Sequence, residues 1–266
     1  MCKDSTWAAR LRALTGAQEI EAYRAIDSTN ARAKAWARAG AAQGALVIAA
    51  GQTAGRGRLG RTFASPADAG LYMTVILWPD GAALERLTIA AAVATCEAIE
   101  ACTPYRPGIK WVNDLWKNGK KVCGILTEAA VDLESGMLDY AVLGLGFNLV
   151  QPSGGWPKEL AAVAGSLFDS APAPGARAAL AAAFLNEFWA LYHTGLRGSW
   201  LDDYRRRQAL TGRHVTLIPN GSEPRGATVL GIDDDCRLLV RCDGDLAPTA
   251  FGSDEIRVIP ELGALA

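Results

Sequence analysis

The stretch GQTAGRGRLGR at 51–61 decides the fold, because apolar runs typical of buried strands lie on both sides of it. These runs are LVIAA at 46–50 and LYMTVILW at 71–78. The glycines of the stretch satisfy the pattern GxGxxG, which in a dinucleotide-binding fold opens a helix and precedes an acid about 20 residues later. Here the next regular element is a strand, and no acid closes such a unit. We therefore reject a Rossmann fold.

The same loop carries chemistry suited to anions. Arg56, Arg58 and Arg61 alternate with its glycines. Glycine lets a backbone approach a ligand closely, and arginine holds carboxylates and phosphates through paired hydrogen bonds. Because three cations so close together repel one another, we expect the loop to be mobile when empty and to order around an anion. Spacing alone leaves two alternatives open, a solvated flexible loop and a basic patch for nucleic acid.

A second polar cluster lies at the end of a short predicted strand, in the segment KWVNDL. Lys110, Asn113 and Asp114 belong to this segment. The Asn-Gly dipeptide that follows predicts a hairpin turn, which would bring Lys121 to the same face of the sheet. Lysine offers a point charge to phosphate, and aspartate oxygen can hold Mg²⁺. For this segment alone, a surface Lys–Asp pair beside a turn remains an alternative.

The overall composition excludes several classes of protein. The chain has 266 residues and a formal net charge of −1, so nothing global indicates a nucleic-acid or membrane binder. Six cysteines without a CxxC pair favour reduced cytosolic thiols over a disulfide framework or a zinc site. The N-terminus is polar, without a signal sequence, and the longest apolar stretches are too short to span a bilayer. We expect a soluble cytoplasmic protein.

The pattern of predicted secondary structure changes after Gly212. Before this point, helical patterns alternate with strands, whereas after it the sequence has short β runs separated by turn residues such as Asn220-Gly221. We therefore predict two domains, 1–211 and 212–266. Helices are expected at 30–41, 84–101, 176–196 and 200–210, and further strands at 109–112, 122–128, 140–148, 213–218, 225–232, 237–242 and 256–259.

Taken together, the motifs resemble the biotin–protein ligase family, the biotin–[acetyl-CoA-carboxylase] ligases. They occur in the family's order and at similar spacing, and the resemblance covers nearly the whole chain. The combination is specific, although each piece alone is not. The matching pieces are DSTN at 27–30, GQTAGRGRLGR at 51–61, LYMTVILW at 71–78, KWVNDL at 110–115, KKVCGILTE at 120–128, GLGFNL at 144–149 and GIDDDCRLLVRCDG at 231–244.

The resemblance implies an α+β fold. Its first part would be a mixed β-sheet flanked by helices, as in class II synthetases, with residues 1–211 as the catalytic domain. Residues 212–266 would form a small SH3-like β-barrel. Only 26 residues precede the DSTN segment, which is too few for the helix-turn-helix repressor domain of some relatives. We therefore expect the form without that domain, and no DNA-binding role.

The resemblance also implies a role for individual residues. Lys121, Arg58, Arg61 and Asp114 would be catalytic, with Lys121 bridging the biotin carboxylate and the reacting phosphate. Asp114 is in addition the candidate base or amine-orienting group, and the candidate Mg²⁺ ligand. Biotin would be bound by Ser28, Thr29, Asn30, Gln52, Gly55, Arg56, Gly57, Lys121, Gly124 and Leu126. ATP would be bound by Arg58, Arg61, Lys110, Asn113, Asp114 and Asn148.

The implied reaction uses ATP, biotin and Mg²⁺, and its acceptor is a lysine of a biotin carboxyl carrier domain. Val112 stands where the family often has proline, and Phe63 lies where a tryptophan commonly follows the loop. The nearest alternative is a lipoate- or octanoate-transferring enzyme; a ligand-binding regulator and a basic-loop RNA binder are others. A homodimer is possible, with 71–78 or the last strands as the pairing edge.

Overall fold

The computed structural model describes residues 4–261 except 18, 133 and 197. A seven-stranded mixed sheet lies at its centre, in the order β1-β2-β3-β7-β6-β5-β4. β1 and β2 are parallel, and each other neighbouring pair is antiparallel. The strands are β1 (Ile20–Tyr23), β2 (Leu46–Ala49), β3 (Gly70–Leu77), β4 (Gly108–Lys110), β5 (Asp114–Lys117), β6 (Lys120–Val131) and β7 (Leu138–Asn148).

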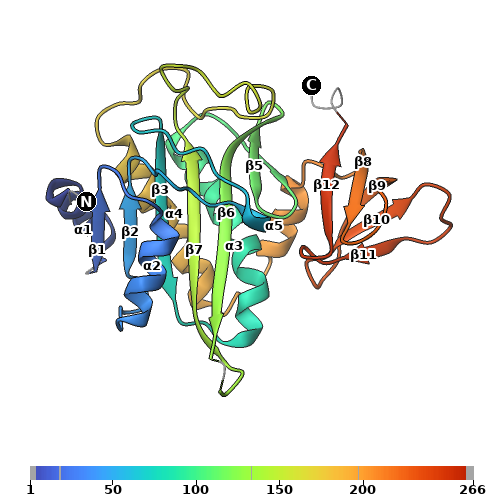
Figure 1. Ribbon diagram of the computed structural model, residues 1–266, viewed down its shortest axis with the longest axis horizontal. Coiled ribbons are helices and arrows are strands. Elements are labelled where there is room, and N and C mark those ends of the chain that lie inside the picture. The colour runs from blue at the N-terminus through green and yellow to red at the C-terminus, as the bar shows by residue number, and fades with distance from the viewer. Residues whose placement is uncertain (1–3, 18, 133, 197, 262–266) are drawn as a thin grey trace.

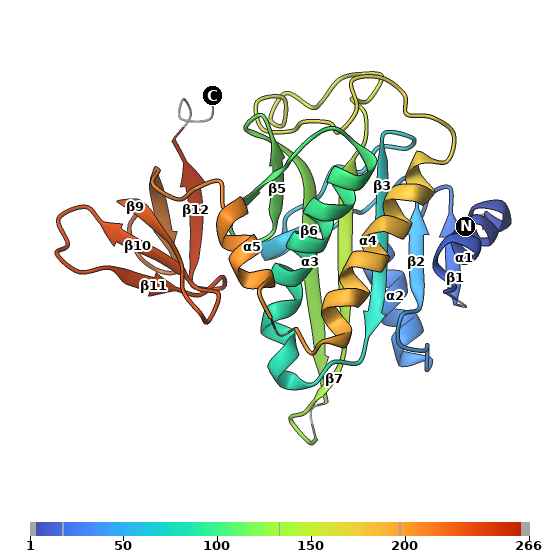
Figure 2. The ribbon, with the colours of Figure 1, turned by 180° about the vertical axis from the view of Figure 1, so that it is seen from behind.

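Helices cover both faces of this sheet. Figure 1 shows α2 in front of one face, and Figure 2 shows α3 and α4 side by side on the other, with α1 beside β1. The mixed sheet flanked by helices that we predicted is thus confirmed. The helices are α1 (Ser5–Thr15), α2 (Thr29–Arg38), α3 (Gly81–Cys102), α4 (Ala176–His193) and α5 (Trp200–Arg207).

β3 is buried along its whole length because it has a hydrophobic cluster on each face. Met73 and Val75 pack in the cluster that contains α3 and α4, whereas Ile76 packs in the smaller cluster under α2. The side-chain period of two in a strand places Thr74 on the α2 face, together with Ile76. A threonine hydroxyl, fully buried, is therefore present in the floor beneath the start of α2.

Local sequence signals place two elements as predicted. Ser28 caps α2, and its hydroxyl oxygen accepts a hydrogen bond from the backbone N–H of Ala31 at 3.4 Å. Asn118 and Gly119 both have positive φ, 50° and 72°, as a two-residue hairpin of type I′ requires. That turn joins β5 to β6.

A second sheet follows α5. Its order is β11-β10-β9-β8-β12 and its neighbouring pairs are antiparallel, so β11 and β12 are its two edges and the structure shows a sheet, not a closed barrel. Four of the five strands were predicted, and Thr249–Phe251 was not. The strands are β8 (His214–Pro219), β9 (Arg225–Ile232), β10 (Leu238–Cys242), β11 (Thr249–Phe251) and β12 (Ile256–Pro260).

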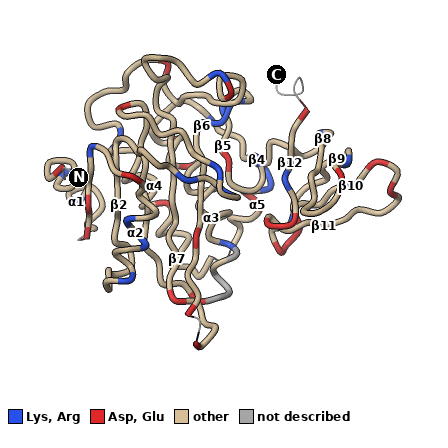
Figure 3. Tube along the Cα trace, viewed as in Figure 1, with Lys and Arg blue, Asp and Glu red and all other residues tan. Residues whose placement is uncertain are grey.

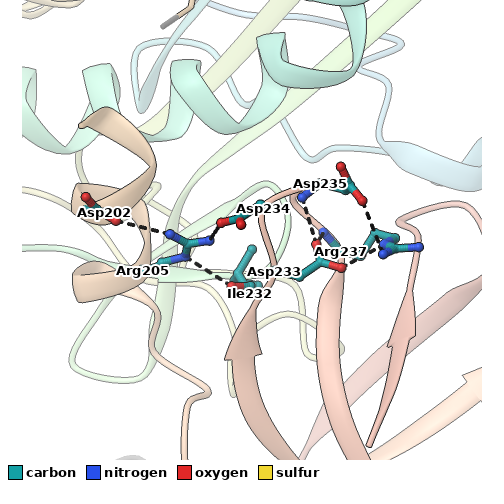
Figure 4. Close-up of polar contacts among 7 residues, drawn as sticks. All are labelled: Asp202, Arg205, Ile232, Asp233, Asp234, Asp235 and Arg237. Carbon is teal, nitrogen blue, oxygen red and sulfur yellow. Dashed lines mark hydrogen bonds and ion pairs between the residues drawn. The ribbon is translucent and has the colours of Figure 1, made fainter. Parts of the chain in front are cut away.

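Side-chain contacts join the second sheet to the first part of the chain (Figure 4). Arg205 of α5 donates to the carbonyl of Ile232 at 3.1 Å and forms an ion pair with Asp234 at 2.5 Å. The Trp111 indole N–H donates to the carbonyl of Cys236 at 3.2 Å. These contacts place the second sheet beside the KWVNDL segment.

One sequence-based expectation is wrong. Residues 71–78 cannot offer a pairing edge for a dimer, because β3 is hydrogen-bonded to β2 on one side and to β7 on the other. The pattern identified a buried strand but carried no information about its position in the sheet. Among the described residues, no helix is both long enough and apolar enough to cross a membrane.

Candidate active site

A cavity opens on the α2 face of the seven-stranded sheet, where the start of α2, the 51–61 loop, β6 and β7 meet. Its volume is about 50 Å³. Figure 3 shows basic residues along the loop that crosses this face and beside β4 and β12. The lining residues are Ser28, Thr29, Asn30, Gln52, Arg56, Gly57, Arg58, Phe63, Asn113, Lys121, Gly124, Ile125, Leu126, Gly144, Leu145 and Gly146.

The floor of the cavity consists of glycines on adjacent strands. Gly124 of β6 pairs with Gly146 of β7, and Gly144 lies two residues before Gly146 on the same face. A Cβ at Gly144 would lie 2.1 Å from Oδ1 of Asn30, and one at Gly146 would lie 2.6 Å from the ring of Phe63. Side chains from the loop and from α2 therefore reach the sheet only because these positions carry none.

The glycines of the 51–61 loop have different reasons to be there. At Gly55 a Cβ would lie 2.4 Å from the carbonyl oxygen of Phe63, so packing excludes any side chain. Gly60 has a φ of +72°, a conformation that favours glycine. A Cβ at Gly57 would make ordinary contacts of 3.4 Å or longer, so neither space nor conformation requires glycine there.

Phe63 fills much of the cavity above the glycine floor. Its ring packs edge-on against Tyr72, with centroids 6.4 Å apart, and the Lys121 ammonium lies 5.2 Å from the ring centre. The remaining volume is far below the roughly 300–1,000 Å³ of typical ligand pockets. A ring-bearing ligand can enter only if Phe63 and the loop that carries it move.

Neutral polar side chains line one end of the cavity. The backbone N–H of Thr29 donates to Oε1 of Gln52 at 2.8 Å, which ties the first turn of α2 to the loop after β2. Ser28, Thr29 and Asn30 are all buried. Capping of α2 and lining of the cavity, the two roles considered for Ser28, occur together.

The opposite end is cationic. The Lys121 ammonium forms an ion pair with Asp114 at 2.6 Å, and Lys110 stands opposite Asp114 in the β4–β5 pairing. The pKa of Lys110 is lowered by its burial, and the like charges of Lys121, Arg257 and Arg61 lower it further, against the raising effect of Asp114. The predicted convergence of two lysines and one aspartate is thus found, with more positive than negative charge around them.

Arg58 connects this cationic end to the second sheet. Its guanidinium donates to Oδ1 of Asn113 at 3.3 Å and to the carbonyl of Ser253, in the turn before β12. Burial lowers its pKa, although Asp114 and Asp254 act in the opposite direction. Arg58 therefore lies between the two parts of the chain.

Asn148 holds the backbone that carries Lys121. Its side-chain amide is buried and donates to the carbonyl of Lys121 at 3.1 Å. The peptide on the other side of Lys121 is fixed as well, since the N–H of Lys121 donates to the carbonyl of Val163 at 2.7 Å. The position of Asn148 suits support of Lys121 more directly than contact with a nucleotide.

Most of the predicted site residues come together in this cavity. The lining includes every predicted biotin-site residue except Gly55, which packs against Phe63 and Ser65. Of the predicted ATP-site residues, Arg58 and Asn113 line the cavity, whereas Arg61, Lys110, Asp114 and Asn148 lie outside the lining set.

Sequence reasoning gave no role to several residues that the structure places here. Gly144 and Gly146 were quoted within GLGFNL only as a motif, although two glycines spaced by two in a strand signal close approach of another group on one face. Arg257 and Thr74 were not singled out. No local pattern marks them, because their proximity to the site depends on sheet order.

Several known proteins are similar in sequence to this chain. A model of the Biotin/lipoate A/B protein ligase family matches residues 22–148. A biotin–[acetyl-CoA-carboxylase] ligase of Mycobacterium tuberculosis is 32% identical over 248 residues, 90% of this chain and 89% of that protein. The bifunctional ligase/repressor BirA of Bacillus spizizenii is 42% identical over 144 residues, 53% of this chain. The chain covers 44% of that relative, less than half its length.

Among solved structures, a biotin protein ligase from Aquifex aeolicus in complex with biotin and ATP has the same fold. The TM-score is 0.74, at 21% sequence identity, over 92% of this chain and 100% of that one. The fold, the length of the match to the Mycobacterium tuberculosis protein and the family model agree. The chain belongs to the biotin–protein ligases within the biotin/lipoate A/B protein ligase family.

Proposed function

We propose that the protein is an ATP-dependent biotin–protein ligase. It converts biotin and ATP to biotinyl-5′-AMP and pyrophosphate, and then transfers the biotinyl group to a lysine of a biotin carboxyl carrier domain. The observation that carries the proposal is one cavity with neutral polar side chains at one end, a glycine floor and a cationic end at Lys121. The name of the relative from Mycobacterium tuberculosis supports it.

In the first step, a carboxylate oxygen of biotin attacks the α-phosphorus of ATP. A new O–P bond forms, the bond to the β-phosphate breaks, and pyrophosphate leaves. Both reactants are anions, so positioning and charge neutralisation dominate the barrier. Lys121 lines the cavity and would contact both the carboxylate and the α-phosphate, while Arg58 and Lys110 would bind the triphosphate.

Mg²⁺ fits this site as an ion that ATP brings with it. The described residues contain no group of three or more His, Cys, Asp or Glu side chains that could hold a metal. One carboxylate, Asp114, lies at the cationic end. A single carboxylate together with phosphate oxygens and waters is a donor set that Mg²⁺ accepts. Asp114 would hold the ion, which would neutralise phosphate charge.

In the second step, the acceptor lysine attacks the carbonyl of the adenylate, an amide bond forms, and AMP leaves. Free lysine is protonated at neutral pH, so the amine must first lose a proton. Asp114 can orient the amine and accept that proton, because phosphate binding by Lys121 would release it from its ion pair. Closure of the 51–61 loop would keep water from the adenylate.

The remaining assignments concern the second sheet. We propose that residues 212–266 form a domain of SH3-like type, and that it contributes to ATP binding from the side of Arg257. The contact between Arg58 and Ser253 and the effect of Arg257 on Lys110 support this position. The same face is a suitable place for the carrier domain to approach.

The test is exchange of labelled pyrophosphate into ATP, with biotin, lipoate and octanoate as alternative acids. We expect exchange with biotin and not with the other two. Exchange with lipoate or octanoate in place of biotin would move the protein to a sister activity of the same family. Absence of exchange with all three acids would contradict an adenylating function.

A further inference from the structure

Two side chains from α5 and its end hold the KWVNDL segment from outside the cavity. The hydroxyl of Tyr204, on α5, donates to the carbonyl of Val112 at 3.2 Å. Oε1 of Gln208, the residue directly after α5, accepts the backbone N–H of Trp111 at 3.2 Å. Both side chains are buried, and neither belongs to the cavity lining. A segment that carries candidate ATP-site residues is therefore held by residues that do not line the site.

The turn between β4 and β5 needs these partners, because strand pairing does not reach it. The register of the two strands ends where Lys110 pairs with Asp114, and Trp111 and Val112 lie between these two residues. Both Trp111 and Val112 are 5% exposed, and a buried backbone group without a hydrogen-bond partner is costly. Side chains 92 and 97 residues further along the chain satisfy two of these backbone groups.

Each of the two hydrogen bonds fixes a peptide next to a candidate ATP-site residue. Gln208 accepts the N–H of the peptide that follows Lys110. Tyr204 donates to the C=O of the peptide that precedes Asn113. The two hydrogen bonds therefore set the spacing between Lys110 and Asn113 across the turn.

The side of the turn that faces the cavity carries the groups assigned to the triphosphate. The side-chain amide of Asn113 donates to the carbonyl of Ile125 at 2.6 Å, and its Oδ1 accepts from Arg58 at 3.3 Å. Asp114, the next residue, forms the ion pair with Lys121. A shift of the peptide before Asn113 would therefore disturb several of these contacts together.

α5 and the residues after it have anchors of their own. Arg207, the last residue of α5, forms an ion pair with Glu100 of α3. The backbone N–H of Ala209 donates to the carbonyl of Ile109 at 2.8 Å, which ties the chain after α5 to β4. The part of the chain that holds the turn is thus fixed by contacts that do not involve the turn.

Tyr204 acts as a hydrogen-bond donor and not as an acid or a base. Its complete burial raises the pKa of Tyr204 well above the ordinary value, although the nearby charge of Arg58 lowers it. The hydroxyl is therefore protonated at the pH of any enzyme assay. The carbonyl of Val112 can only accept, so the direction of this hydrogen bond is fixed.

We propose that Tyr204 and Gln208 are positioning residues for ATP binding, which hold Lys110 and Asn113 at the spacing that the triphosphate requires. This inference rests on the proposed function and adds two residues outside the cavity on which the affinity for ATP depends. The affinity for biotin does not depend on them. The cavity is lined from α2, the 51–61 loop, β6 and β7, and among the described residues neither side chain is hydrogen-bonded to these elements.

The test uses Tyr204→Phe, which keeps the buried ring and removes the hydroxyl. Gln208→Met is the second, independent variant, because it removes the acceptor of the other hydrogen bond. Tyr23→Phe is the matched control, since Tyr23 is also buried and its hydroxyl donates to Glu21 at 2.8 Å, away from the cavity lining. The readouts are the KM for ATP in pyrophosphate exchange, the Kd of ATP and of biotin by calorimetry, and the thermal midpoint.

We expect Tyr204→Phe and Gln208→Met each to raise the KM and the Kd for ATP about fivefold to tenfold, the effect of one buried hydrogen bond. The Kd of biotin should change less than about twofold in both variants. Tyr23→Phe should match the wild type in all of these constants, even if its thermal midpoint falls as far as that of Tyr204→Phe.

An unchanged KM and Kd for ATP in Tyr204→Phe and Gln208→Met would overturn the inference. Equal losses for ATP and biotin, or an equal loss of ATP affinity in Tyr23→Phe, would overturn it as well. In each of these cases, exchange by the wild type with biotin still upholds the proposed function. If the wild type shows no exchange, the proposed function fails, and the Kd of ATP in the variants decides the positioning role separately.

Discussion

Replacement of Lys121 by methionine separates catalysis from stability at the centre of the site. Methionine keeps most of the length of the side chain and removes its charge. The ion pair with Asp114 that is lost joins two partly exposed side chains, with exposed fractions of 28% and 20%. Pairs of this kind contribute about 0–1 kcal/mol to stability. For a chain of this size, we expect the thermal midpoint to fall by no more than about 2–4 °C.

The effect on the reaction should be much larger. Removal of one preorganised group that stabilises transition-state charge typically costs about 10²–10³ in kcat. Lys121 lines the cavity, and its backbone is fixed on both sides by Val163 and Asn148, so the protein cannot readily bring another cation to the same point. We therefore expect pyrophosphate exchange with biotin to fall by about 10²–10³ in Lys121→Met.

Exchange rate and thermal unfolding are measured on the same preparations, with Lys120→Met as the matched control. Lys120 is the preceding residue of β6, but it is exposed, and its ammonium donates to the carbonyl of Ala161 at 3.3 Å. The control should retain wild-type exchange. The reasoning is refuted if Lys121→Met keeps more than about a third of wild-type exchange, or if its loss of activity follows unfolding at the assay temperature.

Three further predictions concern the loop, the second sheet and a histidine. Gly55→Ala should weaken biotin binding at least about tenfold, because its Cβ would meet a backbone carbonyl. Gly57→Ala should bind biotin like the wild type, and titration of both variants with biotin checks this contrast. Arg257→Ala should raise the KM for ATP about threefold to tenfold, which is the effect of one partly screened charge. The KM for biotin should not change, and Arg241→Ala on β10 is the control. The pKa of His214 is raised above its ordinary value of 6.5 by two carboxylate partners. The protonated His214 therefore stabilises the fold fully below pH 6.5, and this stabilisation is lost as the pH rises through the higher folded-state pKa. The difference in thermal midpoint between the wild type and His214→Gln should shrink over the same range of pH.

Long apolar patterns were predictable from sequence, and short polar strands were not. The runs that became β2, β3 and β7 were recognised because both of their faces are buried. β5, with the sequence DLWK, and β1, with the sequence IEAY, carry charged residues within four positions and were missed. Their strand conformation depends on neighbours in the sheet, and sheet order is invisible in the local sequence.

The site was predictable where one motif supplies several groups and unpredictable where distant elements meet. Lys110, Asp114 and Lys121 converge because a recognisable hairpin turn folds them together. Thr74 and Arg257 reach the site through the position of β3 in the sheet and of β12 beside β4, and no spacing rule encodes either.

The most direct test of the central claim is transfer of biotin to protein. The purified chain is incubated with biotin, ATP, Mg²⁺ and a biotin carboxyl carrier domain, and the carrier is analysed by intact mass and peptide mapping. The account predicts addition of one biotinyl group to one lysine of the carrier, dependent on ATP and abolished when that lysine is replaced by arginine. A carrier that remains unmodified, while the same preparation carries out biotin-dependent pyrophosphate exchange, would contradict the ligase assignment and leave an enzyme that only forms the adenylate.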